Sequence, residues 1–235
     1  MRNFILISLF FVSSCATKYI IPGNRFITPE SQGGIFQGQL ELQQTGATLA
    51  TIDTSSGTVN EGVRYKEVAR TGFLLSGSLF NQFDLVWSHT GSSNSMIGGK
   101  FQFFGDPRSG KGAGHKAALA LLMGGNEHES EEEDVEFELT SREYLILYGF
   151  RISENIFPYT SFSYATYNFR GKITSGSLNG LRPEFVSDSR ALNIGTEFSI
   201  ESFFAKIEFT YQRLATSDTK ESERKLMGLS MGFSW

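Results

Sequence analysis

"KLMGLSMGFSW", residues 225–235 at the C-terminus, is the stretch that decides the fold. Every second residue is large and apolar: Met227, Leu229, Met231, Phe233 and Trp235. Between them stand only Gly and Ser. Alternation with a period of two residues predicts a β-strand with two unlike faces, because successive side chains of a strand point to opposite sides. One face of this strand is apolar, and the other carries almost no side chain.

The same alternation recurs along most of the chain, and no interior segment shows the 3.6-residue period of an amphipathic helix. We therefore predict an all-β chain of ten strands, with eight as the alternative if two weak segments are not separate strands. The ten predicted strands lie near 34–50, 64–80, 83–90, 96–104, 115–124, 137–152, 157–172, 190–200, 203–213 and 225–235.

The connections between the predicted strands alternate between short and long. Two to four residues follow the second, sixth and eighth strands, whereas long polar stretches such as "DTSSGTVNEG" follow the first, fifth, seventh and ninth. This alternation is typical of a transmembrane antiparallel up-and-down β-barrel, which has short periplasmic turns and longer extracellular loops. Residues 105–114 are the exception, because they would form a long connection on the short-turn side.

The face opposite the apolar one carries charges of both signs. Mixed charges are costly in a dry core unless they are paired, whereas a narrow polar lumen suits them. We predict that they fill the lumen with salt bridges, since small barrels are just wide enough for side chains to pack inside. A narrow channel for small solutes is the alternative. The predicted lumen charges are Asp84, Lys116, Arg151, Glu197, Lys206 and Glu208.

The last strand resembles the C-terminal strand of bacterial outer-membrane β-barrel proteins, which ends in alternating apolar residues and a terminal Phe or Trp. Phe233 and Trp235 match this pattern. The resemblance implies that the barrel-assembly machinery reads this signal and that the barrel lies in the lipid bilayer of the outer membrane.

The N-terminus has a positive residue, Arg2, followed by an apolar run that is too short to span a bilayer as a helix. Residues 1–14 are therefore expected to be a signal peptide. Val12-Ser13-Ser14-Cys15 resembles a bacterial lipobox, which implies that lipoprotein-processing enzymes cleave before Cys15 and attach a lipid to it. The alternative is an ordinary signal peptide that is cleaved after Ala16.

These signals divide the chain into a signal peptide, a lipidated N-terminal segment over 15–33 and a barrel over 34–235. An even number of strands returns both ends of a barrel to one side. We therefore expect the N-terminus on the periplasmic side and the long loops outside the cell.

"GDPRSGKG", residues 105–112, looks like a phosphate-binding loop, but Gly112 replaces the required Ser or Thr. An amphipathic strand precedes it and another strand is predicted to follow, whereas a phosphate loop leads into a helix. We interpret its Gly, Pro and Asp residues as those of a turn between two strands, and we expect no nucleotide binding. A net charge of −4 also argues against a nucleic-acid partner.

An acidic run in one predicted outer loop offers oxygen ligands for a divalent cation. A solvated loop is the simpler interpretation, because like charges repel. The weak metal candidates are Glu129, Glu131, Glu133 and Asp134. No cofactor is expected.

His89 lies close in sequence to Ser92 and Ser93, as the His and Ser of outer-membrane lipid A deacylases do, although the spacing differs. An enzyme acting on lipid A or peptide at the rim is therefore an alternative. The main expectation is no enzyme, but a small lipid-anchored barrel that is structural or interacts through its outer loops.

Overall fold

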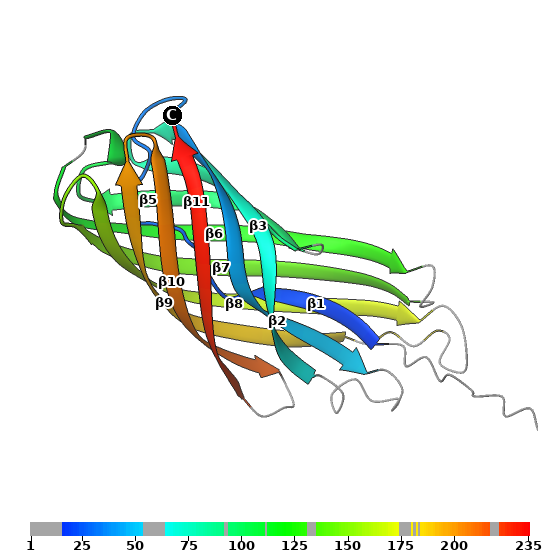
Figure 1. Cartoon of the computed structure of the whole chain (residues 1–235). Helices are drawn as coiled ribbons and strands as arrows, with labels where there is room; N and C mark the ends of the chain where they lie inside the picture. Colours follow the sequence, from blue (N-terminus) through cyan, green and yellow to red (C-terminus); the bar gives the residue numbers. More distant parts are fainter. Residues whose placement is uncertain are drawn as a thin grey trace, which may run out of the picture.

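The computed structural model describes residues 16–53, 64–91, 94–110, 112–130, 135–173, 180, 182, 184–216 and 221–235. Ten long strands run up and down in chain order (Figure 1). They are β2 (Gly38–Asp53), β3 (Arg64–Phe80), β4 (Phe83–Thr90), β5 (Asn94–Phe104), β6 (Gly114–Ser130), β7 (Val135–Arg151), β8 (Ile156–Ile173), β9 (Glu184–Ile200), β10 (Phe203–Thr216) and β11 (Ser222–Ser234).

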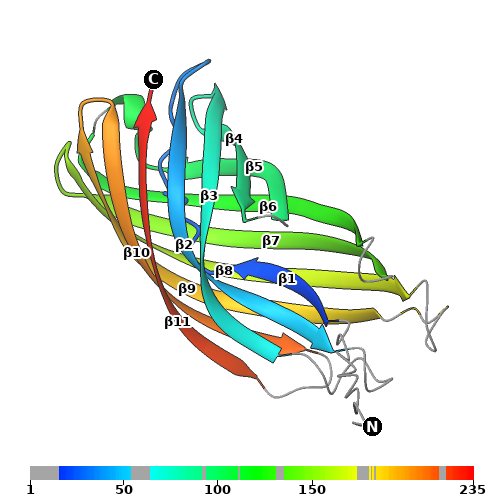
Figure 2. The same cartoon turned by 45° about the vertical axis from the view of Figure 1, so that its right-hand side comes forward.

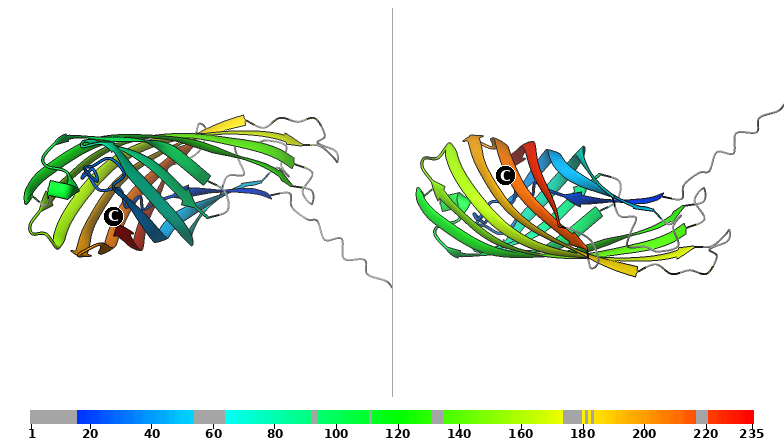
Figure 3. Two further views of the ribbon diagram at one scale, coloured as in Figure 1. Left: turned by 90° about the horizontal axis from the view of Figure 1, so that it is seen from above. Right: turned by 90° about the horizontal axis from the view of Figure 1, so that it is seen from below.

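Each of these strands pairs antiparallel with the next, and β11 pairs with β2 to close the sheet. The closing register runs from Leu229↔Gln44 to Ser234↔Gln39. Seen from above and below, the strands surround a central lumen (Figure 3). The ten-stranded closed barrel confirms the prediction, and each predicted segment overlaps one observed strand.

Two further elements were not predicted. A short strand, β1 (Ala16–Pro22), pairs antiparallel with the distal half of β2, from Ala16↔Asp53 to Pro22↔Ala47. A single 3₁₀ turn, η1 (Arg108–Gly110), lies in the connection between β5 and β6. Within the described residues, no helix has both the length and the apolar composition that a membrane span requires.

The wall of the barrel is taller on one side than on the other. β6, β7 and β9 have 17 residues each, whereas β4 has 8. A strand of 17 residues measures about 56 Å, and a membrane-spanning strand needs only about 9–11 residues. The long strands therefore extend well past a bilayer at the end that carries the long connections, as Figure 2 shows.

Two predicted loops are therefore shorter than the sequence suggested. β6 continues to Ser130 and β9 begins at Glu184, whereas the alternation had placed these limits at 124 and 190. Past Arg190, the outward residues of β9 are Asp188, Val186 and Glu184, so the apolar period is broken there. Backbone pairing nevertheless continues, as in Ser130↔Val135.

The outward faces form a continuous apolar belt. Ile97, Ile146, Ile194 and Leu229 come from four different strands and are 50–63% exposed. A soluble monomer rarely exposes apolar patches of such extent. A closed sheet with an apolar exterior and a polar interior satisfies every backbone group in lipid. The chain thus has the architecture of an outer-membrane β-barrel.

We expect Ile194→Arg, in the middle of the belt on β9, to lower the free energy of unfolding by about 2–4 kcal/mol in lipid vesicles. Val186→Arg is the matched control, because Val186 faces outward on the same strand beyond the belt and is 42% exposed. Denaturant unfolding in vesicles measures both variants. Equal, small effects at the two positions would contradict a lipid-facing belt.

Candidate functional site: a lumen sealed by residues 19–33

The lumen is occupied by the chain's own N-terminal segment, residues 19–33, which we call the plug. Every residue from 19 to 32 is buried. The plug enters beside β2 at the end with the long connections and descends inside the ring of strands (Figure 3). It leaves near the short turns, where the Gly33 amide donates to Ser78 Oγ at 2.9 Å.

The plug places the two ends of the described chain at opposite ends of the barrel. Ala16 pairs with Asp53, next to a long connection, whereas the Gly38 amide donates to the carbonyl of Trp235 at the short-turn end. The expectation of both termini on one side is therefore wrong. That expectation holds for β2 to β11. The chain before β2 crosses the lumen once more, so residues 19–33 of the predicted lipidated segment form the plug.

Glu208 holds the plug by its backbone at mid-height. Its carboxylate accepts hydrogen bonds from the amides of Arg25 at 2.7 Å and Phe26 at 3.1 Å. A third bond comes from Tyr159 Oη at 2.9 Å. Phe26 has a φ of 55°, which a bulky residue rarely adopts. This conformation turns two successive amides toward one carboxylate, an anion-binding arrangement of the backbone.

Arg25 joins the plug to β7 and β8. Its Nε donates to Glu143 at 2.7 Å, and its Nη2 donates to Tyr167 Oη at 3.1 Å. Glu143 is fully buried, so the guanidinium supplies the counter-charge that this carboxylate needs away from the surface.

Two buried lysines bind the plug's carbonyls. Lys206 Nζ donates to the carbonyl of Phe26 at 2.8 Å and pairs with Glu41 at 2.6 Å. Lys100 Nζ donates to the carbonyls of Thr28 and Glu30, and it pairs with Asp84 at 3.0 Å. Each lysine therefore donates hydrogen bonds to plug carbonyls and also neutralises one carboxylate of the wall.

Near the short turns, a chain of charges closes the lumen. Arg151 pairs with Glu30 of the plug, with its Nε 2.7 Å from Oε1, and lies 3.4 Å from Glu197. Arg108 also pairs with Glu197, and its amide donates to the carbonyl of Ser31 at 2.9 Å. The turn that resembles a phosphate loop thus inserts a guanidinium into the barrel.

The six predicted lumen charges all lie inside the barrel and are at most 4% exposed. Five of them interact with other charged side chains or with the plug, as described above. The sixth, Lys116, donates to the carbonyl of Asp106 at 2.8 Å.

Two apolar clusters complete the filling. At the long end, Tyr19 and Ile21 pack with residues such as Tyr167 and Leu214, and lower down Ile27 packs among Leu74, Val86, Met96 and further inward residues of β3 to β7. The sequence did not indicate them, because a plug has no periodicity.

One overlooked signal for the plug was the small inward face of β11. A Cβ on Gly228 would lie 2.6 Å from the Phe26 ring and from Asn24 Oδ1. The glycine therefore leaves the space that the plug fills.

The other candidate residues are not brought together into a site. Glu129 lies in β6, whereas Glu131, Glu133 and Asp134 fall outside the described residues, as does Cys15. The described part of the chain holds no metal-ligating cluster of acids, His and Cys. Phe233 and Trp235 lie on the outward face, with their rings 5.5 Å apart.

His89 contacts Ser95 rather than the serines that the sequence suggested. Its Nδ1 lies 2.8 Å from Ser95 Oγ, and its ring stacks on Phe73. Ser92 and Ser93 lie outside the described residues. Among the described residues, no carboxylate bonds to the imidazole, so a complete triad is not formed there.

Arg25→Met should lower the free energy of unfolding by about 3–5 kcal/mol, because it leaves Glu143 buried without a counter-charge. The double variant Arg25→Met/Glu143→Leu should recover most of this loss. Equilibrium unfolding in lipid vesicles gives the coupling free energy of the pair. Additive effects of the two single changes would show that the pair does not form.

No protein-family model matches this chain, and no curated protein matches it. The crystal structure of Ail, the attachment invasion locus protein of Yersinia pestis, aligns over 86% of this chain and 100% of its own, with 12% identity and a TM-score of 0.43. The outer-membrane channel DcaP of Acinetobacter baumannii aligns over 94% and 97%, with 7% identity and a TM-score of 0.20. Likenesses this low carry no functional inference.

Proposed function

We propose that this protein is a sealed outer-membrane barrel that does not conduct and that acts through the strands and loops at its long end. The observation that carries the proposal is the burial of every residue from 19 to 32 within the lumen. We expect a segment with this many bonds to the wall to block the passage of ions and solutes. The narrow-channel alternative would require the plug to leave.

The long end is suited to contact with other molecules, because β7 to β11 form a sheet that projects beyond the belt. Outward ion pairs cross its strands, including Lys172–Glu136 at 3.0 Å and Arg213–Glu223 at 3.0 Å. On its inner side, Tyr19 and Ile21 of β1 pack against Leu139 and Phe169. The projection therefore has two layers, and its strands present a surface for contact in addition to the connections.

We place the long connections outside the cell, by the rule that barrels keep short turns on the periplasmic side. Ala16 then lies at the outer end. Cys15 precedes it directly, so a lipid on Cys15 would enter the leaflet at that end. This placement replaces the periplasmic anchor that the strand count suggested.

The sealed lumen is tested in planar bilayers. The full-length barrel should show no conductance steps, and deletion of residues 19–32 should produce steps of fixed size. The triple variant Arg25→Ser/Phe26→Ser/Ile27→Ser provides a second route to a loosened plug if the deletion does not fold. Regular conductance steps from the unaltered protein would contradict the proposal.

Lipidation is tested by metabolic labelling with a palmitate analogue. Labelling should be present in the unaltered protein and absent from Cys15→Ala, with Ser14→Ala as the neighbouring control. If the unaltered protein is not labelled either, Cys15 carries no lipid, and the N-terminal segment is an ordinary signal peptide cleaved after Ala16.

A further inference from the structure

The outer wall of the barrel carries a row of cations just beyond the apolar belt. On four strands, the first outward polar residue beyond the apolar belt is Arg or Lys. These are Arg142 on β7, Arg190 on β9, Arg213 on β10 and Lys225 on β11. The outward residue before each, toward the short turns, is Tyr144, Leu192, Tyr211 or Met227.

The row lies where a bilayer would change from acyl chains to headgroups. Tyrosines favour that level, because their rings are apolar and their hydroxyls are polar. The outward acids lie farther from the belt: Glu138 on β7, Asp188 and Glu184 on β9, and Glu223 on β11. Positive charge thus faces the boundary, and negative charge faces the water beyond it.

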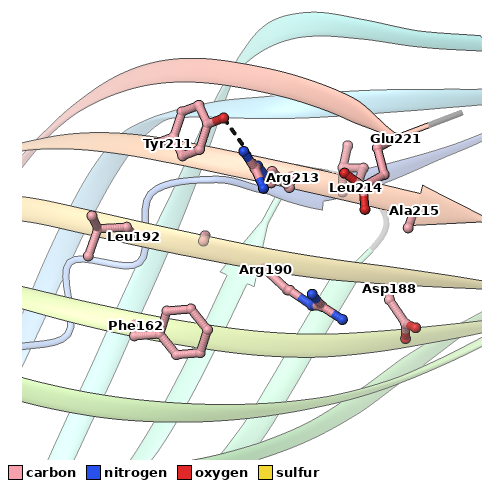
Figure 4. A pocket seen from close by; sticks show the side chains of 10 residues that line it. Phe162, Asp188, Arg190, Leu192, Tyr211, Arg213, Leu214, Ala215 and Glu221 are labelled. Carbon is pink, nitrogen blue, oxygen red and sulfur yellow. Dashed lines mark hydrogen bonds between the residues drawn. The ribbon is translucent and has the colours of Figure 1, made fainter.

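Two of these cations, Arg190 and Arg213, line a pocket of about 260 Å³ on the outer wall. Arg190 and Arg213 are directly opposed in the register of β9 and β10. Figure 4 shows Phe162 and Leu192 toward one end of this pocket and Asp188 toward the other, with Arg190 between them. The apolar end joins the belt, so the pocket runs from lipid to water.

The two guanidiniums are not equally satisfied. Arg213 pairs with Glu223 at 3.0 Å and bonds to Tyr211 Oη at 3.2 Å. Among the described residues, no acid lies within ion-pair distance of Arg190, although it stands beside a like charge. Asp188, its neighbour along β9, instead accepts bonds from Tyr164 Oη at 3.1 Å and Thr166 Oγ1 at 3.2 Å.

Like charges opposed on neighbouring strands are destabilising unless an anion lies between them. Guanidinium groups bind phosphate oxygens with paired hydrogen bonds. Glu221 also lines the pocket, but it lies just before β11, toward the end that faces water. The pocket therefore offers an apolar end, a guanidinium without an ion-pair partner among the described residues, and a second guanidinium on the neighbouring strand.

We propose that this pocket binds the phosphate of a membrane lipid headgroup in the leaflet at the long end, with an acyl chain lying over Phe162 and Leu192. The site rests on the proposed membrane placement. It does not depend on the sealed lumen, because Arg190 and Arg213 point away from the plug.

The test is lipid binding to the purified barrel in detergent micelles, measured by native mass spectrometry. The probes are phosphatidic acid and a diacylglycerol with the same chains. Unaltered protein should bind phosphatidic acid and show much weaker binding of diacylglycerol. The affinity of Arg190→Gln/Arg213→Gln for phosphatidic acid should be at least about tenfold lower, because the charge-assisted bonds are lost.

Arg170→Gln/Lys172→Gln is the matched control, since it removes two outward cations of β8 that lie beyond the row. It should bind phosphatidic acid like the unaltered protein. An equal loss in this control, or equal binding of the two lipids, would overturn the site. Inorganic phosphate should not compete at equimolar concentration, and competition there would show a free-phosphate site instead.

Unboiled and boiled samples of each variant on a gel check that the barrel is folded. Bilayer recordings separate this proposal from the previous one. A conducting protein that still binds phosphatidic acid through Arg190 would refute only the sealed lumen, and a silent barrel without phosphate selectivity would refute only the lipid site.

Discussion

The structure depends on one constraint: a backbone that crosses the lumen of a barrel must find a partner for its polar groups inside the barrel. The first residues of the plug, up to Pro22, meet it through the ladder with β2, and from Arg25 onward wall side chains take over. Glu208 accepts two of its amides, and Lys206 and Lys100 donate to three of its carbonyls. Because unpaired buried groups cost about 1–3 kcal/mol each, the wall charges and the plug stabilise one another.

The same constraint explains why the lumen holds so many charged residues without acting as a pore. Glu197 and Glu143 would be costly alone in a dry interior. Arg25 from the plug and Arg108 from the β5–β6 turn supply their counter-charges. These arginines lie in segments that do not belong to the wall, so the filling is built from both ends of the barrel.

The alternation of apolar with small or polar residues predicted the ten strands, because each wall residue faces either the exterior or the lumen. The inward charges of β4 to β10 were visible for the same reason. The plug was not, because Arg25 to Ser31 follow no period and their partners lie up to 183 residues away. Gly228 carried one local trace of it, and Arg108 was obscured by its likeness to a phosphate loop. The row of cations could not be predicted from the sequence, because it depends on which residues of neighbouring strands lie side by side.

Amide hydrogen exchange of residues 19–32 in the membrane-embedded protein tests the central claim most directly. A segment sealed in the lumen should exchange as slowly as the paired amides of β7 and β8, because it is buried and bonded along its length. Exchange of the Arg25 and Phe26 amides at the rate of a solvated chain, while the strands stay protected, would contradict the account.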